Sequence, residues 1–189
     1  MARMINEKGF TALELMVVVA VSTIMMYAMF IVMQFGSLHL ETADLTMNIH
    51  DNARDGVYKM AQEMRMSAPS KVAIGAGCTS VSFNVPDPNS PVTSGYAISW
   101  PGHAIQYSYS SSTRKITRTN STTGQTSTMG NDVSSAMFTT DTTAPFTCVV
   151  GASPSAVSIV LTVQHQLKNG NWVPTTALQI AGLARIRNT

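Results

Sequence analysis

The chain has little charge for its length. Charged residues make up 12% of the 189 positions, and the net charge is +2, whereas soluble domains usually carry about 25% charged residues. No run of lysine or arginine occurs, so the sequence gives no basis for a nucleic-acid-binding surface. Two features account for the shortfall: an uncharged apolar segment near the start and a middle region rich in serine and threonine.

Motifs of catalysis are also missing. The sequence contains no Gly-x-Ser-x-Gly element, no phosphate-binding P-loop and no His-Glu-x-x-His pair. Its two cysteines form no Cys-x-x-Cys pair, and its four histidines complete no zinc pattern. The isolated histidines are His39, His50, His103 and His165. The sequence therefore predicts neither an enzyme nor a bound cofactor, and a membrane-anchored enzyme is the least favoured interpretation.

What the sequence does contain is a long apolar run close to its start. The 19 residues from Leu15 to Met33 carry no charge. As a helix they would span about 28 Å, close to the thickness of the hydrocarbon layer of a bilayer. The basic residues Arg3 and Lys8 lie before the run. The positive-inside rule therefore places the N-terminus in the cytoplasm and everything after Phe35 outside.

Three interpretations of this run differ in what they explain. A secretory signal peptide has a shorter apolar region and a small-x-small cleavage site after it, which residues 34–38 match poorly. A plain signal anchor fits the length but does not explain Glu14, because an ionisable group inside an apolar helix costs about 3 kcal/mol on insertion scales and usually has a partner. The third interpretation comes from the residues around Glu14.

The segment from Lys8 to Met16, Lys-Gly-Phe-Thr-Ala-Leu-Glu-Leu-Met, resembles the class III signal of type IV pilins and pseudopilins. It combines a short basic leader, a Gly-Phe-Thr junction, a placed glutamate and a membrane-length run. The resemblance implies that a prepilin peptidase cuts between Gly9 and Phe10, that the new amine of Phe10 is methylated, and that Glu14 docks the subunit. The implied partners are other pilin or pseudopilin subunits, an inner-membrane assembly platform and the membrane.

Elementary electrostatics gives the glutamate a role in such a filament. Cleavage would expose a positively charged amine on Phe10, and in an apolar core of packed helices an amine and a carboxylate are each costly alone. Glu14 of one subunit placed opposite Phe10 of a neighbour would offset both desolvation costs and fix the axial register. In a lone molecule in the membrane, Glu14 can instead reach the interface near the helix end.

The two cysteines gain a use from this orientation. If the residues after the apolar run lie outside the cytoplasm, a disulfide between Cys78 and Cys148 is expected. It would close a loop of about 70 residues and stabilise the fold by about 4 kcal/mol in the chain-entropy model. The alternative is two unrelated buried thiols.

A helical pattern continues beyond the apolar run. Apolar residues recur at spacings of three, four and seven, as on one stripe of a helix. The stripe consists of Leu38, Leu45, Ile49, Ala53, Val57, Met60 and Met64. Because Pro69 must lie beyond the helix, we expect its end near Met66 or Ser67 and a length of about 85 Å from Phe10. Gly36 and Gly56 are candidate soft points within it.

The remainder of the chain reads as strands. Alternation of apolar and polar residues predicts strands at 81–85, 105–109, 114–118, 157–167 and 176–186, with a hairpin turn at Asn169-Gly170. The fold class is α+β and pilin-like: a long N-terminal helix, membrane-spanning in its first half, packed on a largely antiparallel β-sheet head. The expected parts are a removed leader (1–9), a transmembrane or filament-core helix half (10–35), an amphipathic half (36–67) and a β-rich head (68–189).

A weaker resemblance connects the head to the larger minor pilins and to the J-type pseudopilin. It depends on Ile105 to Tyr107, on Arg118 and on Arg187-Asn188. It implies a low-abundance subunit that initiates or caps pilus assembly, with a type II secretion pseudopilin at the pseudopilus tip as the alternative. In either case the head lies in the periplasm before assembly, and in an extracellular pilus or a periplasmic pseudopilus afterwards.

Three secondary hypotheses concern the surface of the head. A pilus-borne adhesin head is a further alternative, which an exposed aromatic patch at Trp100 or Trp172 would favour. The Asn120-Ser121-Thr122 sequon is either a glycan acceptor or, as we favour, part of a solvated loop. Asp87-Pro88-Asn89 and Asn131-Asp132 offer oxygen ligands for calcium, but neither matches a loop signature, so no metal site is predicted.

Overall fold

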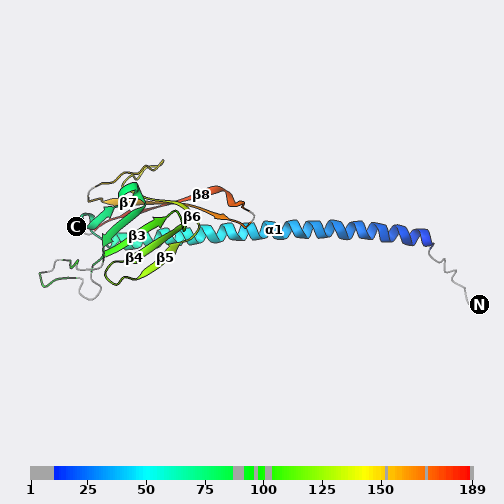
Figure 1. Ribbon diagram of the computed structural model, residues 1–189, viewed down its shortest axis with the longest axis horizontal. Helices are drawn as coiled ribbons and strands as arrows, with labels where there is room; N and C mark the ends of the chain where they lie inside the picture. The colour runs from blue at the N-terminus through cyan, green and yellow to red at the C-terminus, as the bar shows by residue number, and fades with distance from the viewer. Residues whose placement is uncertain are drawn as a thin grey trace, which may run out of the picture. The chain divides into compact units, whose positions relative to one another are not determined.

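A single long helix, α1, runs from Ala12 to Arg65 in the computed structural model of the chain (Figure 1). The structure describes residues 11–86, 92–95, 98–100, 104–151, 153–168 and 170–187. The predicted helix is confirmed, and it ends one residue before Met66. The amides of Met66 and Ser67 donate to carbonyls three residues earlier, which is how helices commonly close their last turn. Pro69 then opens the short 3₁₀ helix η1 (Pro69–Lys71).

The chain divides into two compact units, and the boundary lies within α1. In the first unit, Met1–Asp44, the described residues belong to α1 and to the residue before it. The second unit, Leu45–Thr189, contains the rest of α1 and all of the strands that the structure describes. The apolar run and the head domain therefore belong to different units.

The strands of the second unit form two antiparallel sheets. The order is β1-β2-β3-β4-β5 in the first sheet and β6-β7-β8 in the second. A 3₁₀ helix, η2 (Ala76–Cys78), lies between β1 and β2. The strand bounds are β1 Val72–Ile74, β2 Ser80–Asn84, β3 Ala104–Ser110, β4 Lys115–Asn120, β5 Thr126–Gly130, β6 Val133–Thr139, β7 Ala156–Gln166 and β8 Trp172–Arg185.

The α+β class and its antiparallel strands agree with the sequence analysis, but the division into two sheets was not anticipated. The five predicted strands correspond to β2, β3, β4, β7 and β8. Three strands were missed: β1 has three residues, β5 has little apolar alternation, and a register shift between Val133 and Ser135 breaks the alternation of β6. At the predicted hairpin turn, Asn169 lies outside the described residues.

Both sheets and α1 share one core. Phe83 and Tyr107 from the first sheet and Phe138 from the second are fully buried, as is Met60 of α1. The buried residues of α1 are Ile49, Ala53, Gly56, Val57, Met60, Ala61 and Met64. Leu38, which the sequence analysis assigned to the apolar stripe, belongs to the first unit and is 56% exposed. The amphipathic packing therefore begins near Leu45, later than the pattern suggested.

Two glycines bring α1 close to the sheets. A Cβ atom on Gly56 would lie 2.6 Å from the carbonyl oxygen of Met129 in β5, and one on Gly182 in β8 would lie 2.3 Å from Cγ1 of Val57. Both distances are shorter than real Cβ contacts, so a larger residue at either position would have to displace its neighbour. Gly56, which we had considered a soft point, therefore acts as a close contact between helix and strand.

Candidate functional site

The start of α1 presents a polar arrangement at the edge of an apolar segment. Thr11 directly precedes the helix, and Glu14 lies in its first turn. Oε2 of Glu14 accepts hydrogen bonds from the backbone N–H and from Oγ1 of Thr11, both at 3.0 Å. The N–H of Glu14 donates in turn to Oγ1 of Thr11 at 3.3 Å. This reciprocal pattern is a capping box, which satisfies backbone donors that the first turn leaves without partners.

The capping box gives Thr11 a role that the sequence analysis missed. A threonine three residues before a glutamate, just ahead of an apolar run, is the sequence signature of the motif, so the signal was present. In the single chain the carboxylate of Glu14 is thus held by its own helix. Thr11 is therefore the hydrogen-bond partner of the Glu14 carboxylate in the isolated chain, and any other partner must compete with it.

From Leu15 to Met33 the helix is apolar on all sides. An 18-residue window of α1 has a mean hydropathy of 2.5, and none of that window is buried within the chain. In the described residues this is the one helix long and apolar enough to cross a membrane. Thr23, a polar residue within the run, directs its hydroxyl to the carbonyl of Val19 at 2.7 Å. Such a local bond satisfies the hydroxyl without water, as a membrane-embedded helix requires.

The predicted processing residues cannot be placed in this arrangement. Gly9 and Phe10, like the whole predicted leader 1–9, lie outside the described residues. Cleavage between them and methylation of Phe10 therefore stay predictions.

The predicted disulfide is confirmed. Cys78 in η2 is bonded to Cys148, 70 residues further along the chain. The bond fastens the segment after β6 to the first sheet. Within that segment the carboxylate of Asp141 accepts hydrogen bonds from the N–H groups of Thr143 and Thr147 and from the Thr147 hydroxyl. These donors lower the pKa of Asp141, because they stabilise the ionised form.

A polar cluster that sequence reasoning did not identify joins α1 to the first sheet. The carboxylate of Glu63 accepts a hydrogen bond of 2.6 Å from the hydroxyl of Tyr107 in β3 and bonds of 3.0 and 3.2 Å from Nε of Arg118 in β4. Burial, together with the Glu63 carboxylate, raises the pKa of Tyr107. Partial burial lowers the pKa of Arg118, but the hydrogen bond to Glu63, the charge of Glu63 and smaller contributions from Tyr107 together outweigh it, and the net shift is upward. Glu63 lies between stripe residues, so its position gave no signal.

The remaining candidate residues have local roles or lie outside the described chain. Nδ1 of His165 is 2.9 Å from Oδ1 of Asp132. Oδ1 of Asn120 caps a turn by accepting from two backbone amides. Arg114 stacks over Trp172, 4.4 Å from the ring centroid, and Trp100 is half-buried. In the part of the chain that the structure describes, no group of three or more His, Cys, Asp or Glu residues could hold a metal; 87–89 and His103 fall outside that part.

Together these features define a class: an α+β protein with one exposed apolar helix that can span a membrane and a disulfide-bonded β head. No protein-family model, no curated protein and no solved structure matches the chain.

Proposed function

We propose that the chain is a structural subunit of a type IV filament, and within that class a low-abundance minor pilin that initiates or caps assembly. The observation that carries the proposal is Glu14, an acid directly before the apolar run of α1, none of whose most apolar 18-residue window is buried within the chain. Such a helix needs an apolar environment, which either a bilayer or a bundle of like helices supplies. The acid needs a cationic partner there.

The proposed docking reaction is an exchange of partners. In the single chain the Glu14 carboxylate is bonded to Thr11. After cleavage, the α-amine of Phe10 on a neighbouring subunit offers a charged donor, and a charge-assisted bond is stronger than a bond to a neutral hydroxyl. The exchange favours the assembled state and fixes the axial position of each helix, because only one register brings the two groups together.

The disulfide supports the proposed location of the head. Disulfides persist in oxidising compartments such as the bacterial periplasm and the cell surface, and Cys78 and Cys148 are bonded. We therefore propose a single-pass inner-membrane protein whose head faces the periplasm before assembly. A type II secretion pseudopilin would have the same location, and the abundance of the subunit in sheared pili distinguishes the two.

The proposal is tested by determining which residue forms the N-terminus of the mature chain. The full chain is expressed with and without a prepilin peptidase, and its N-terminal residue is determined by mass spectrometry. We expect methylated Phe10 only when the peptidase is present, and no cleavage in a Gly9→Leu variant. An intact Met1 in the presence of an active peptidase, or a cut after the apolar run, contradicts the proposal.

A second measurement tests the docking role. Glu14→Gln keeps the shape of the side chain and removes its charge, so the subunit should be processed but at least about tenfold depleted from sheared filaments, a loss equivalent to roughly one strong polar interaction. Glu41→Gln, on the same helix beyond the apolar run, is the matched control and should assemble normally. Equal incorporation of both variants would exclude the docking role of Glu14.

A further inference from the structure

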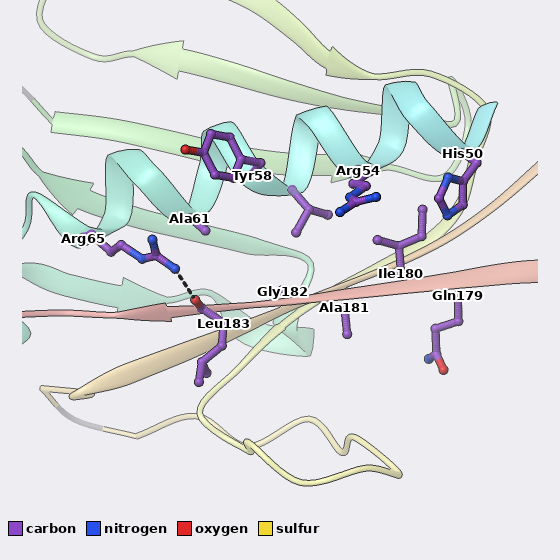
Figure 2. A pocket seen from close by; sticks show the side chains of 11 residues that line it. His50, Arg54, Tyr58, Ala61, Arg65, Gln179, Ile180, Ala181, Gly182 and Leu183 are labelled. Carbon is purple, nitrogen blue, oxygen red and sulfur yellow. Dashed lines mark hydrogen bonds between the residues drawn. The ribbon is translucent and has the colours of Figure 1, made fainter. Parts of the chain in front are cut away.

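The free edge of β8 lies beside α1 and forms a groove with it. The groove has a volume of about 380 Å³. Helix residues His50, Arg54, Tyr58 and Arg65 form one rim, and the β8 segment 179–183 forms the other (Figure 2). β8 pairs only with β7, so its second edge is not covered by a strand of the described chain.

The backbone groups that face the groove can be identified from two hydrogen bonds. Arg65 donates to the carbonyl of Leu183 at 3.2 Å (Figure 2), whereas the N–H of Ile186 donates to Ser155, on the side of β7. In an antiparallel strand the N–H and C=O of one residue point to the same side, and the side alternates along the chain. Gln179, Ala181 and Leu183 therefore direct their backbone groups into the groove.

These groups are available to a partner. Apart from the bond from Arg65 to Leu183, the hydrogen bonds of the described chain leave the groove-facing N–H and C=O groups of 179–183 without an acceptor or donor. Natural proteins usually block a long edge with proline or charge. In β8, Pro174 and Arg185 lie towards its two ends, and the segment between them contains neither. An edge left open in this way is a template for another strand.

The charge around the groove indicates the chemistry of that strand. Arg54 and Arg65 lie on the rim, and Arg185 and Arg187 line a second hollow that shares Arg65. No carboxylate lines either hollow in the described residues. Asp51 lies 3.5 Å from His50 on the same helix but is not among the lining residues. An acidic occupant would therefore be attracted.

We propose that the groove between α1 and β8 accepts an extended, acidic segment of another protein subunit, which pairs with β8 as an additional strand. Backbone hydrogen bonds to Gln179, Ala181 and Leu183 would hold the segment, and its carboxylates would lie against the arginines, as in other strand-addition complexes. Ile180, whose side chain lies on the side of β8 towards α1 (Figure 2), supplies an apolar floor. A polypeptide is favoured over a nucleic acid because a phosphate backbone cannot pair with the edge carbonyls.

The inference depends on the proposed function only for the source of the segment, a neighbouring subunit of the filament. Its test is independent of processing and assembly. The full chain, in detergent micelles, is titrated with a fluorescent pool of eight-residue peptides that have glutamate at every second position and threonine, valine or isoleucine between. We expect saturable binding that weakens at high salt, and amide exchange of Gln179, Ala181 and Leu183 slowed at least about tenfold.

Two variant pairs isolate the contributions of backbone and charge. Ala181→Pro removes a groove-facing N–H without breaking the ladder to β7 and should reduce affinity at least about tenfold. Ala177→Pro, in the same strand but outside the groove and the paired register of β7, should bind normally. Arg54→Glu should weaken binding, whereas Lys115→Glu, on an exposed position of β4, should not.

Four results would overturn the inference: no binding of the peptide pool, equal binding of a pool with alternate backbone amides methylated, full binding by Ala181→Pro, or displacement of the peptides by a 20-base-pair DNA duplex at equal charge. Self-association of the chain that Ala181→Pro abolishes would also overturn it, in favour of a second copy. If peptides bind but Phe10 is never exposed in the processing experiment, the proposed function fails while the groove stands.

Discussion

Replacing Glu63 with alanine should remove the one carboxylate that both Tyr107 and Arg118 bond in the polar cluster that holds α1 against the first sheet. Tyr107 is fully buried, and its hydroxyl donates to Glu63 at 2.6 Å. Without the carboxylate this buried hydroxyl loses the acceptor to which it donates. Arg118, whose side chain is 23% exposed, also loses its partner but can regain some hydration.

The geometry gives the magnitude. A buried donor left without a partner costs about 2 kcal/mol, and the loss of a partly exposed ion pair adds about 1 kcal/mol, so Glu63→Ala should destabilise the head by about 3 kcal/mol. Tyr107→Phe removes the donor but keeps the ring against Phe83, 5.8 Å away between centroids, and should cost about 1 kcal/mol. In the double variant no hydroxyl remains to be orphaned, so its cost should be about 2 kcal/mol, which corresponds to a coupling of about 2 kcal/mol.

The assay is urea unfolding of the full chain in detergent, followed by tryptophan fluorescence, because Trp100 and Trp172 both lie in the second unit. With a slope of about 1.5 kcal/mol per molar urea, Glu63→Ala should lower the midpoint by about 2 M. Gln62→Ala, an exposed neighbour on α1, should shift the free energy of unfolding by less than about 0.5 kcal/mol. Costs of Glu63→Ala and Tyr107→Phe that simply add would refute the coupling.

Two further predictions concern the other contacts that hold the head together. Reduction of the Cys78–Cys148 bond, or the double replacement of both cysteines by serine, should lower the free energy of unfolding by about 4 kcal/mol, and calorimetry with and without reductant measures it; an unchanged melting temperature would contradict this. Gly182→Ala places a methyl group 2.3 Å from Cγ1 of Val57 and should destabilise the head by about 1–3 kcal/mol in the same urea assay. Gly170→Ala has open space around the new methyl group but a positive φ, and it should cost about 1 kcal/mol. Rescue of Gly182→Ala by Val57→Ala would confirm the close contact, and no rescue would argue against it.

The helix and the alternating strands could be predicted because each satisfies a local rule. The stripe from Ile49 to Met64 has helical spacing and is buried, as the pattern predicts. In β7 the alternating apolar residues from Val157 to Val163 are buried as well, but Ser158 and Val160 between them are also buried, which the alternation does not predict. The close approach at Gly56 could not be predicted in the same way, since it depends on Met129 of β5, a strand with little apolar signal. Long-range pairing leaves little trace in one sequence.

The same distinction between local and long-range contacts applies to the candidate site. Glu14 and its Thr11 partner are three residues apart, and their contact is encoded locally. The Glu63–Arg118 pair spans 55 residues, and the groove beside β8 exists only because α1 and the second sheet meet. Sequence reasoning therefore reached the acid at the start of the helix and missed the polar cluster and the open edge of the head.

The exposed apolar helix constrains how assembly of the proposed filament can be driven. Transfer of the helix from a bilayer into a bundle of like helices exchanges one apolar environment for another, so the hydrophobic effect contributes little to that step. Besides the packing of the helices against one another, the free energy that favours the proposed filament must then come from groups whose partners change. These are the Glu14 carboxylate, which exchanges Thr11 for an amine, and surfaces of the head such as the β8 edge, which exchange water for a neighbouring chain. A variant that keeps the apolar run of α1 but can make neither of these new contacts should be stable in the membrane and absent from filaments.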